Sequence, residues 1–329
     1  MTTRSAKPPT RLSDSERKVL AAATWGSAPS IEEIARRTNL KIHSVRYSMR
    51  KLLDERVLYR SILINHGRLG YSIANMFFSI PQRSKEKVLA YLSVQPEVVW
   101  FQEHAGDYRF ELSILVKRVG ELQQLIDSLS EKYGVGLNNK VWAIENNWHF
   151  FGNRYLGKGV MGIDPVCHAD LLAPATESDA LDRRILHHLE AGKLKSEADI
   201  ARALKVPTSS LSYRIDRLKE EGIILDERYF IDCEKLGYQE YEIIVDAQSA
   251  ADKLRRGFVN WCTNNPAVLC CFRCFGGWDY KAVLHATSLD EAMEIQDELV
   301  THFDGASKTT LIPCRRLICS GISAEMGPF

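Results

Sequence analysis

Two segments of the chain, residues 41–52 and 208–218, interleave basic and hydroxyl side chains with apolar ones at helical spacing. The apolar residues recur every three or four positions, so the polar set between them faces outward on a helix. Cationic groups on such a face contact phosphates, and hydroxyl and ring groups contact base edges. The candidate DNA-contacting residues are therefore Lys41, His43, Ser44, Arg46, Tyr47, Arg50, Lys51, Thr208, Ser209, Ser210, Ser212, Tyr213, Arg214 and Arg217.

A second chemical candidate is the cysteine-rich run CCFRC at residues 270–274. In a strand, Cys271 and Cys274 point to opposite faces because they lie three residues apart, so they do not share one metal ion. The chain has no other Cys-x-x-Cys pair. We expect cysteines of the core or of a sheet face and no metal site, with redox chemistry of one exposed thiol as the alternative.

The same 25-residue pattern occurs at residues 34–58 and 200–224. Aligning Ile34 with Ile200 keeps the apolar positions in register without a gap, while the polar residues between them differ. Apolar pairs at spacings of three and four mark a buried helical face. The repeat therefore predicts two copies of one structural unit.

Each copy divides into three helices followed by β-rich residues. The helices are expected at residues 14–24, 30–38 and about 42–56, and again at 180–192, 196–204 and about 208–221. Ser13 and Asp179 precede the first helices as N-caps, and Ser30 begins a capping box. Residues 57–65 and 223–232 favour a hairpin in each copy. Helix, short helix, turn, helix and hairpin form a winged helix-turn-helix.

The segment after each copy is expected to run strand, helix, two strands, helix, strand, which is the ferredoxin-like βαββαβ arrangement. The fold class is therefore α+β, with two winged helix-turn-helix domains alternating with two ferredoxin-like domains. The expected boundaries are a tail at 1–10, units at 11–71 and 72–151, a linker at 152–178, units at 179–238 and 239–322, and a tail at 323–329.

Charge differs between the two copies, although the whole 329-residue chain has a net charge of +1. Residues 11–71 carry twelve Lys and Arg against six Asp and Glu, whereas residues 181–238 carry eleven of each. The first copy is thus the stronger attractor of a phosphate backbone. No stretch of 18 apolar residues exists, and the polar N-terminus predicts a disordered tail rather than a signal peptide. These features favour a cytoplasmic protein without a membrane partner.

The order of elements resembles the Lrp/AsnC, or feast/famine, regulators, here as a tandem over residues 11–151 and 180–322. The second copy carries the pattern SSLSYRIDRLKEEGII, and the first departs from it with Ser48 and Arg56 in place of Arg214 and Gly222. The resemblance implies a transcriptional regulator of double-stranded DNA. It also implies a small amino-acid-like effector at turns that here read GDYRF and GGWDY. The implied effector residues are Gly106, Asp107, Arg109, Gly276, Gly277 and Asp279.

Siroheme decarboxylases look similar, being built from the same two-domain unit, and His104 and His149 would be the candidates for such chemistry. Neither turn carries the dense set of Arg and His that several substrate carboxylates demand. The sequence analysis therefore favours a regulator over an enzyme, with no catalytic residues and no cofactor. We also expect the two ferredoxin-like domains to pair, because the bare face of a lone four-stranded sheet rich in Trp and Phe needs a cover.

Overall fold

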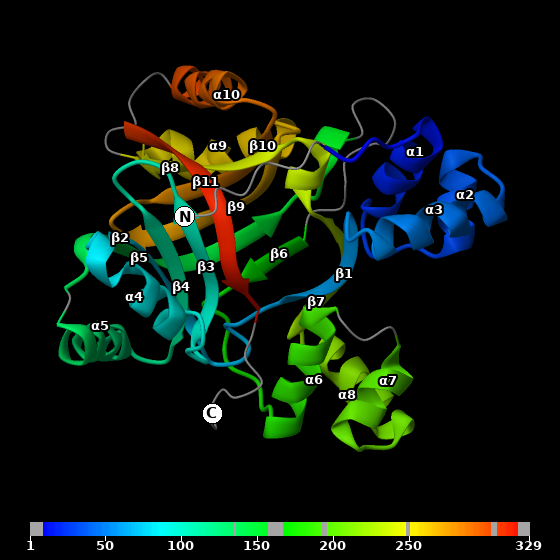
Figure 1. Ribbon diagram of the computed structural model, residues 1–329, viewed down its shortest axis with the longest axis horizontal. Coiled ribbons are helices and arrows are strands. Elements are labelled where there is room, and N and C mark those ends of the chain that lie inside the picture. The colour runs from blue at the N-terminus through cyan, green and yellow to red at the C-terminus, as the bar shows by residue number, and fades with distance from the viewer. Residues whose placement is uncertain are drawn as a thin grey trace.

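The computed structural model describes residues 9–134, 136–156, 167–192, 196–247, 251–303 and 308–321. It consists of two three-helix heads, a two-stranded ribbon that joins them, and one large closed sheet with helices on its outside (Figure 1). The α+β class and the tandem arrangement predicted from the sequence are confirmed. Nearly all of the predicted tails, 1–10 and 323–329, lie outside the described residues.

The heads follow the predicted helices within two residues. The first head contains α1 (Asp14–Ala23), α2 (Ile31–Thr38) and α3 (Ile42–Asp54), and the second contains α6 (Ala180–Ala191), α7 (Glu197–Leu204) and α8 (Thr208–Glu220). The predicted N-caps are present, and both Ser13 and Asp179 form complete capping boxes. Satisfying the free N–H groups of the first turn fixes where each helix begins.

The turn between the last two helices of each head has the same backbone conformation. Asn39 and Lys205 end the short helices in the left-handed region, with φ of 55° and 57°. After the third helix, Arg56 takes φ of 54° where the second copy has Gly222 at 69°. The first copy therefore keeps the fold of the second at a position where glycine is the less strained residue.

The hairpin predicted in each copy is wrong. Each copy supplies a single strand, β1 (Leu58–Ile64) or β7 (Ile224–Ile231), and these two strands pair with each other in antiparallel register from Leu58 opposite Ile231 to Ile64 opposite Ile224. Each strand begins directly after a head, so antiparallel pairing places the heads at opposite ends of the ribbon (Figure 1). Seven residues of strand span about 23 Å.

The first ferredoxin-like half contains β2 (Ser72–Ser79), α4 (Lys85–Leu92), β3 (Val98–His104), β4 (Phe110–Val116), α5 (Gly120–Tyr133) and β5 (Asn138–Phe150). The second contains β8 (Gln239–Asp246), α9 (Ala251–Asn264), β9 (Val268–Gly276), β10 (Tyr280–Ala286), α10 (Leu289–His302) and β11 (Lys308–Ser320). Both follow the predicted order of elements.

The last strand of each half joins it to the other half. β5 pairs with β2 of its own half and with β9 of the other, and β11 pairs with β8 and β3. The sheet order β2-β4-β3-β11-β8-β10-β9-β5, with β5 returning to β2, closes eight strands into a barrel. The predicted pairing of the ferredoxin-like domains therefore takes place within one chain.

The predicted linker contains structure that the sequence analysis missed. Strand β6 (Cys167–Asp170) pairs with the end of β5, from Phe150 opposite Cys167 to Asn147 opposite Asp170. A short 3-10 helix, η2 (Arg154–Leu156), follows β5, and a second, η3 (Cys233–Leu236), follows β7. Residues 157–166 of the linker lie outside the described residues.

The barrel strands alternate between two environments. Phe110, Leu112 and Ile114 of β4 pack outward in the apolar core beneath α4 and α5, and Tyr280, Ala282 and Leu284 of β10 do the same beneath α9 and α10. The residues between them face the barrel interior, since successive side chains of a strand point to opposite faces. No helix in the described ranges is long and apolar enough to cross a membrane.

Candidate functional site

The outward face of α3 is basic. Lys41, His43, Arg46 and Arg50 are all exposed, and the ring of Tyr47 is 67% exposed among them. Within the described part of the chain, no carboxylate forms an ion pair with any of these four basic residues. Ser44 is half-buried beside them. A helix face with free cations and an aromatic ring suits contact with a phosphate backbone and base edges.

The equivalent arginines of α8 are bound within their own head. The Arg214 guanidinium donates to Asp179 at 2.7 Å and to Asp182 at 2.8 Å, and Arg217 donates to Asp182 at 2.5 Å. Asp182 is fully buried, so it depends on these partners. The Ser212 hydroxyl donates to Glu197 at 2.7 Å. Arg214 and Arg217 therefore stabilise the second head itself.

Lys51 has the same structural role in the first head. Its ammonium lies 2.7 Å from the carboxylate of Glu16, the capping-box acid of α1, as Arg217 lies beside Asp182, the capping-box acid of α6. The bond from Lys51 is the main reason that the pKa of Glu16 lies below its ordinary value. Of the predicted DNA-contacting cations, Lys51, Arg214 and Arg217 thus tie the third helix to the first helix of their heads.

The remaining exposed positions differ in charge between the heads. Arg50 of α3 corresponds to Asp216 of α8, and Arg46 corresponds to Ser212. Thr208, Ser209 and Tyr213 are exposed and Ser210 is half-buried, so α8 presents hydroxyls and an acid where α3 presents cations. The two third helices therefore share a framework but not a surface.

The two predicted effector turns lie at the same end of the barrel. Tyr108 of the first turn and Trp278 of the second both pack on Phe77 of β2, with ring centroids 5.5 and 5.2 Å apart. Phe77 and Trp278 are buried. This aromatic contact fills the space between the turns, and the sequence analysis did not predict it.

The two turns differ in how open they are. A Cβ atom at Gly106 would meet no heavy atom within 4 Å, and both Asp107 and Arg109 are exposed. At Gly277 a Cβ would lie 2.2 Å from the Val141 side chain of β5. At Gly276 it would lie 2.6 Å from the backbone oxygen of Trp142 in the same strand. Asp279 is exposed, but its carboxylate accepts the backbone N–H of Ala247 at 2.8 Å. The first turn is the more open of the two.

A buried ion pair lies inside the barrel. The Lys281 ammonium of β10 donates to Glu111 of β4 at 2.6 Å, and both side chains are almost fully buried. Glu111 also accepts from the amides of Asn75 and Gln102, at 2.7 and 2.8 Å. With these donors the carboxylate is well satisfied, as a buried charge must be.

Two further carboxylates surround the same ammonium. Glu145 of β5 lies 3.6 Å and Glu242 of β8 lies 3.7 Å from Lys281 Nζ. Burial disfavours all of these charges, yet Lys281 holds the pKa of Glu111 below its ordinary value. Burial raises the pKa of Glu145 to about 7 and that of Glu242 well above its usual range. The interior thus holds more carboxyl groups than cations to pair with them.

Glu111 and Lys281 occupy equivalent positions in the two halves. Glu111 stands opposite Phe77 and Lys281 stands opposite Ile244 in matching strand registers. By the same registers Asn75 corresponds to Glu242. The ion pair inside the barrel therefore joins two residues that occupy the same position in the two copies and carry opposite charges.

His104 and His149 lie in different surroundings, and the three cysteines of the CCFRC run are divided among apolar clusters. His104 is buried in the barrel interior near Glu111, whereas His149 packs against His168, with ring centroids 4.6 Å apart, and against Phe151. Burial, followed by His168, lowers the pKa of His149 to about 4. Cys270, Cys271 and Cys274 belong to three different apolar clusters, as expected for thiols on opposite sheet faces.

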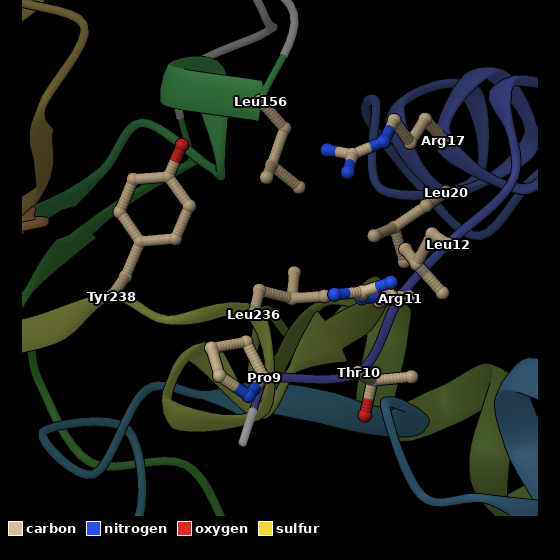
Figure 2. Close-up of a pocket in the computed structure, with 9 residues that line it drawn as sticks. All are labelled: Pro9, Thr10, Arg11, Leu12, Arg17, Leu20, Leu156, Leu236 and Tyr238. Atoms are coloured by element: carbon tan, nitrogen blue, oxygen red, sulfur yellow. The ribbon is translucent and has the colours of Figure 1, made fainter.

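A cavity of about 370 Å³ lies at the joint between the first head and the second half of the chain (Figure 2). Thr10 donates its N–H to the Lys235 carbonyl at 2.7 Å there, and Lys235 caps the carbonyls that end α3. None of the predicted site residues lines it. The lining residues are Pro9, Thr10, Arg11, Leu12, Arg17, Leu20, Leu156, Leu236 and Tyr238.

Comparison with known sequences places the heads among regulators. A family model described as a winged helix-turn-helix DNA-binding domain matches residues 178–224. The DNA-binding transcriptional activator DecR of Escherichia coli K12 is 26% identical over 133 residues, which is 40% of this chain and 88% of DecR. The HTH-type transcriptional regulator PH0140 of Pyrococcus horikoshii is 37% identical over 78 residues, 23% of this chain and 49% of its own length.

Comparison with solved structures concerns the whole chain. The siroheme decarboxylase NirDL aligns with a TM-score of 0.59 at 12% identity and covers 93% of both chains. Its complex with an iron-uroporphyrin III analogue gives a TM-score of 0.58 at 13% identity. At this identity the likeness shows the fold. The exclusion of an enzyme on sequence grounds is nevertheless wrong, because an enzyme shares nearly the entire architecture.

The resemblance seen in the sequence is confirmed. The second head matches a winged helix-turn-helix DNA-binding model, and the chain is similar in sequence to transcriptional regulators such as DecR. The chain carries a winged helix-turn-helix DNA-binding domain, resembles Lrp/AsnC-type regulators and contains two copies of the three-helix unit.

Proposed function

We propose that this protein is a sequence-specific transcriptional regulator in which the first head makes the leading contact with double-stranded DNA. The observation that carries the proposal is the exposed face of α3, where Lys41, His43, Arg46 and Arg50 lie without carboxylate partners among the described residues. The family model of winged helix-turn-helix DNA-binding domains matches the second head, at residues 178–224. A protein with this function works in the cytoplasm.

The arrangement of the heads supports recognition of an asymmetric site. A homodimer presents two identical heads and therefore binds a palindrome, whereas this chain presents a basic helix and a largely hydroxyl-bearing one. The ribbon of β1 and β7 holds the heads at its two ends. Contacts from α8 then add specificity through Thr208, Ser209 and Tyr213 rather than charge.

Binding of the full chain to a labelled random-sequence duplex, followed by fluorescence anisotropy at several salt concentrations, tests the proposal. We expect the logarithm of the affinity to fall linearly with the logarithm of salt, with a slope of about −3 to −4 for the cations of this face. Selection from a random DNA pool should then enrich a non-palindromic sequence. Absence of binding at low salt would reject the function.

For an effector, the geometry favours one site per chain at the first turn. Gly106 leaves the backbone open, and Asp107 and Arg109 offer one charge of each sign to a zwitterion such as an amino acid. The second turn is packed against β5 through Gly276 and Gly277. The protein would thus take fewer ligands than it has ferredoxin-like halves.

A second candidate function is the modification of a tetrapyrrole, as in siroheme decarboxylase. It rests on the alignment over 93% of both chains, which reproduces the order of heads and halves in one polypeptide.

One ligand screen distinguishes the two functions. Amino acids, small acids and iron-uroporphyrin III are added to the full chain, and thermal stability, calorimetric stoichiometry and porphyrin absorption are recorded. We expect an amino-acid-like compound to bind once per chain and Arg109→Ala to abolish that binding. Two equivalent sites would contradict the effector proposal. A saturable shift of the porphyrin band, followed by loss of a carboxylate, would establish the second function instead.

A further inference from the structure

Three side chains from three strands bring nitrogen, oxygen and sulfur together inside the barrel. His104 of β3, Glu242 of β8 and Cys314 of β11 offer ligand atoms that all lie within 4.8 Å of one another. Each of the three is buried, and His104 is fully so. The His104 Nδ1 atom lies 3.9 Å from the Cys314 sulfur. No residue of this set was grouped with the others by the sequence analysis.

A carboxylate lies beside the other ring nitrogen of the histidine. The Nε2 atom is 3.4 Å from Oε2 of Glu111, which is paired with Lys281, but it forms no hydrogen bond among the described residues. A small rotation of the ring would allow Nε2 to donate to this carboxylate, as the second N–H of a metal-ligating histidine usually does, while Nδ1 faces Cys314.

One carboxyl oxygen of the cluster has no hydrogen-bond donor. Glu242 Oε2 is buried and has no hydrogen-bond partner among the described residues, while Oε1 lies 3.4 Å from Gln102 and 3.7 Å from Lys281. Lys281 is already paired with Glu111 at 2.6 Å. A buried carboxylate oxygen without a donor is costly, and a cation at this point satisfies it.

We propose that His104, Glu242 and Cys314 bind a divalent transition-metal ion, for which Zn²⁺ is the best chemical match. An imidazole, a carboxylate and a thiolate together suit this borderline-soft ion, which takes sulfur at about 2.3 Å and nitrogen or oxygen at about 2.0–2.2 Å. Ligand atoms around such an ion lie about 3.3–3.8 Å apart, so small side-chain movements complete the site. In the bound form the Cys314 thiolate and the Glu242 carboxylate balance the two charges of the ion.

The ion would join the two halves of the chain. His104 belongs to the first half and Glu242 and Cys314 to the second, and Cys314 stands opposite His104 where β11 pairs with β3. This is one of the two seams that close the barrel. Three protein ligands leave one coordination position of the ion for water, and removal of the ion should lower the stability of the seam rather than act at the DNA-binding heads.

Metal analysis of the full chain tests the site. The protein is expressed in zinc-supplemented medium, purified without chelators and measured by mass spectrometry of the element. We expect about one zinc per chain for the wild type and for Cys274→Ala, and at least a tenfold loss for Cys314→Ala. Cys274 is a matched control because it is also a buried barrel cysteine. Zinc retained by Cys314→Ala, or absent from the wild type, would overturn the proposal.

Cobalt gives a second measurement that does not depend on the folding of a variant. The wild-type chain refolded with Co²⁺ should show the near-ultraviolet absorption of a cobalt–thiolate bond, and Cys274→Ala should show the same band. Cys314→Ser should lose it while keeping the wild-type circular dichroism. A wild-type cobalt complex without thiolate absorption would show that Cys314 is not a ligand and would refute the site as proposed.

Discussion

The Lys281→Met variant is expected to lose about 3–5 kcal/mol of unfolding free energy at pH 7, since it leaves the buried Glu111 carboxylate without its cation. The ion pair is 2.6 Å long, and the side chains of Glu111 and Lys281 are 0% and 4% exposed. Methionine fills a similar volume, so the lost charge rather than a cavity causes the effect. Urea denaturation of the full chain measures it.

The destabilisation caused by Lys281→Met should change with pH in a direction that follows from the pKa of Glu111. In the wild type, Lys281 holds the pKa of Glu111 below its ordinary value, so the pair contributes stability at neutral pH that is lost as pH falls below the ordinary carboxyl range. In Lys281→Met, the strongest influence that lowers the pKa of Glu111 is lost, and burial then raises this pKa. The destabilisation should therefore shrink as pH falls from 7 toward 4, because protonation removes the unpaired charge. Adding Glu111→Gln should recover most of the loss at pH 7, and a double variant no more stable than the single one would disprove the account.

The second large effect is on DNA binding. Replacing Arg46 and Arg50 together with Ala should weaken binding by about 10- to 100-fold at moderate salt, since each lost phosphate contact removes about 1 kcal/mol or somewhat more. The salt slope should become less steep by about 2. Both side chains are exposed and lie without carboxylate partners among the described residues, so the thermal stability should stay at the wild-type value.

The matched control is the pair Arg214→Ala and Arg217→Ala in the second head. These arginines bind the buried Asp182, so their loss should lower the stability of that head and change DNA affinity less than threefold. Conversely, Ser212→Arg with Asp216→Arg gives α8 the charge of α3 and should raise affinity. Equal losses from the two double-alanine variants would show that charge does not distinguish the heads.

Local signals in the sequence were sufficient to predict the helices of the two heads. Ser13 and Asp179 cap the first helices because their side chains reach the free N–H groups a few residues away, and this depends on spacing alone. The ferredoxin-like order was predicted from alternating patterns of similar length. The pairing of β1 with β7 was not predicted, because the paired residues are far apart in the chain, from Leu58 with Ile231 to Ile64 with Ile224, and each strand pairs as well in a hairpin on local grounds.

The barrel interior could not be predicted for a different reason. In β4 the polar Glu111 and Ser113 alternate with apolar residues, a pattern that is typical of a sheet with one face in water. Closure of eight strands buries that polar face, and closure depends on β5 and β11, each of which pairs with one strand of either half. His104, Glu242 and Cys314 meet for the same reason, and nothing in their spacing indicates it.

The opposite charges at one duplicated position affect how this gene can evolve. A homodimer of the first half would place two copies of Glu111 in contact, and a homodimer of the second would do so with Lys281. Either homodimer would bury two like charges at its centre, which is costly. We therefore expect a substitution at one of these positions to require a compensating change at its copy. The two halves are complementary rather than interchangeable, and a change of charge in one of them has consequences for the other.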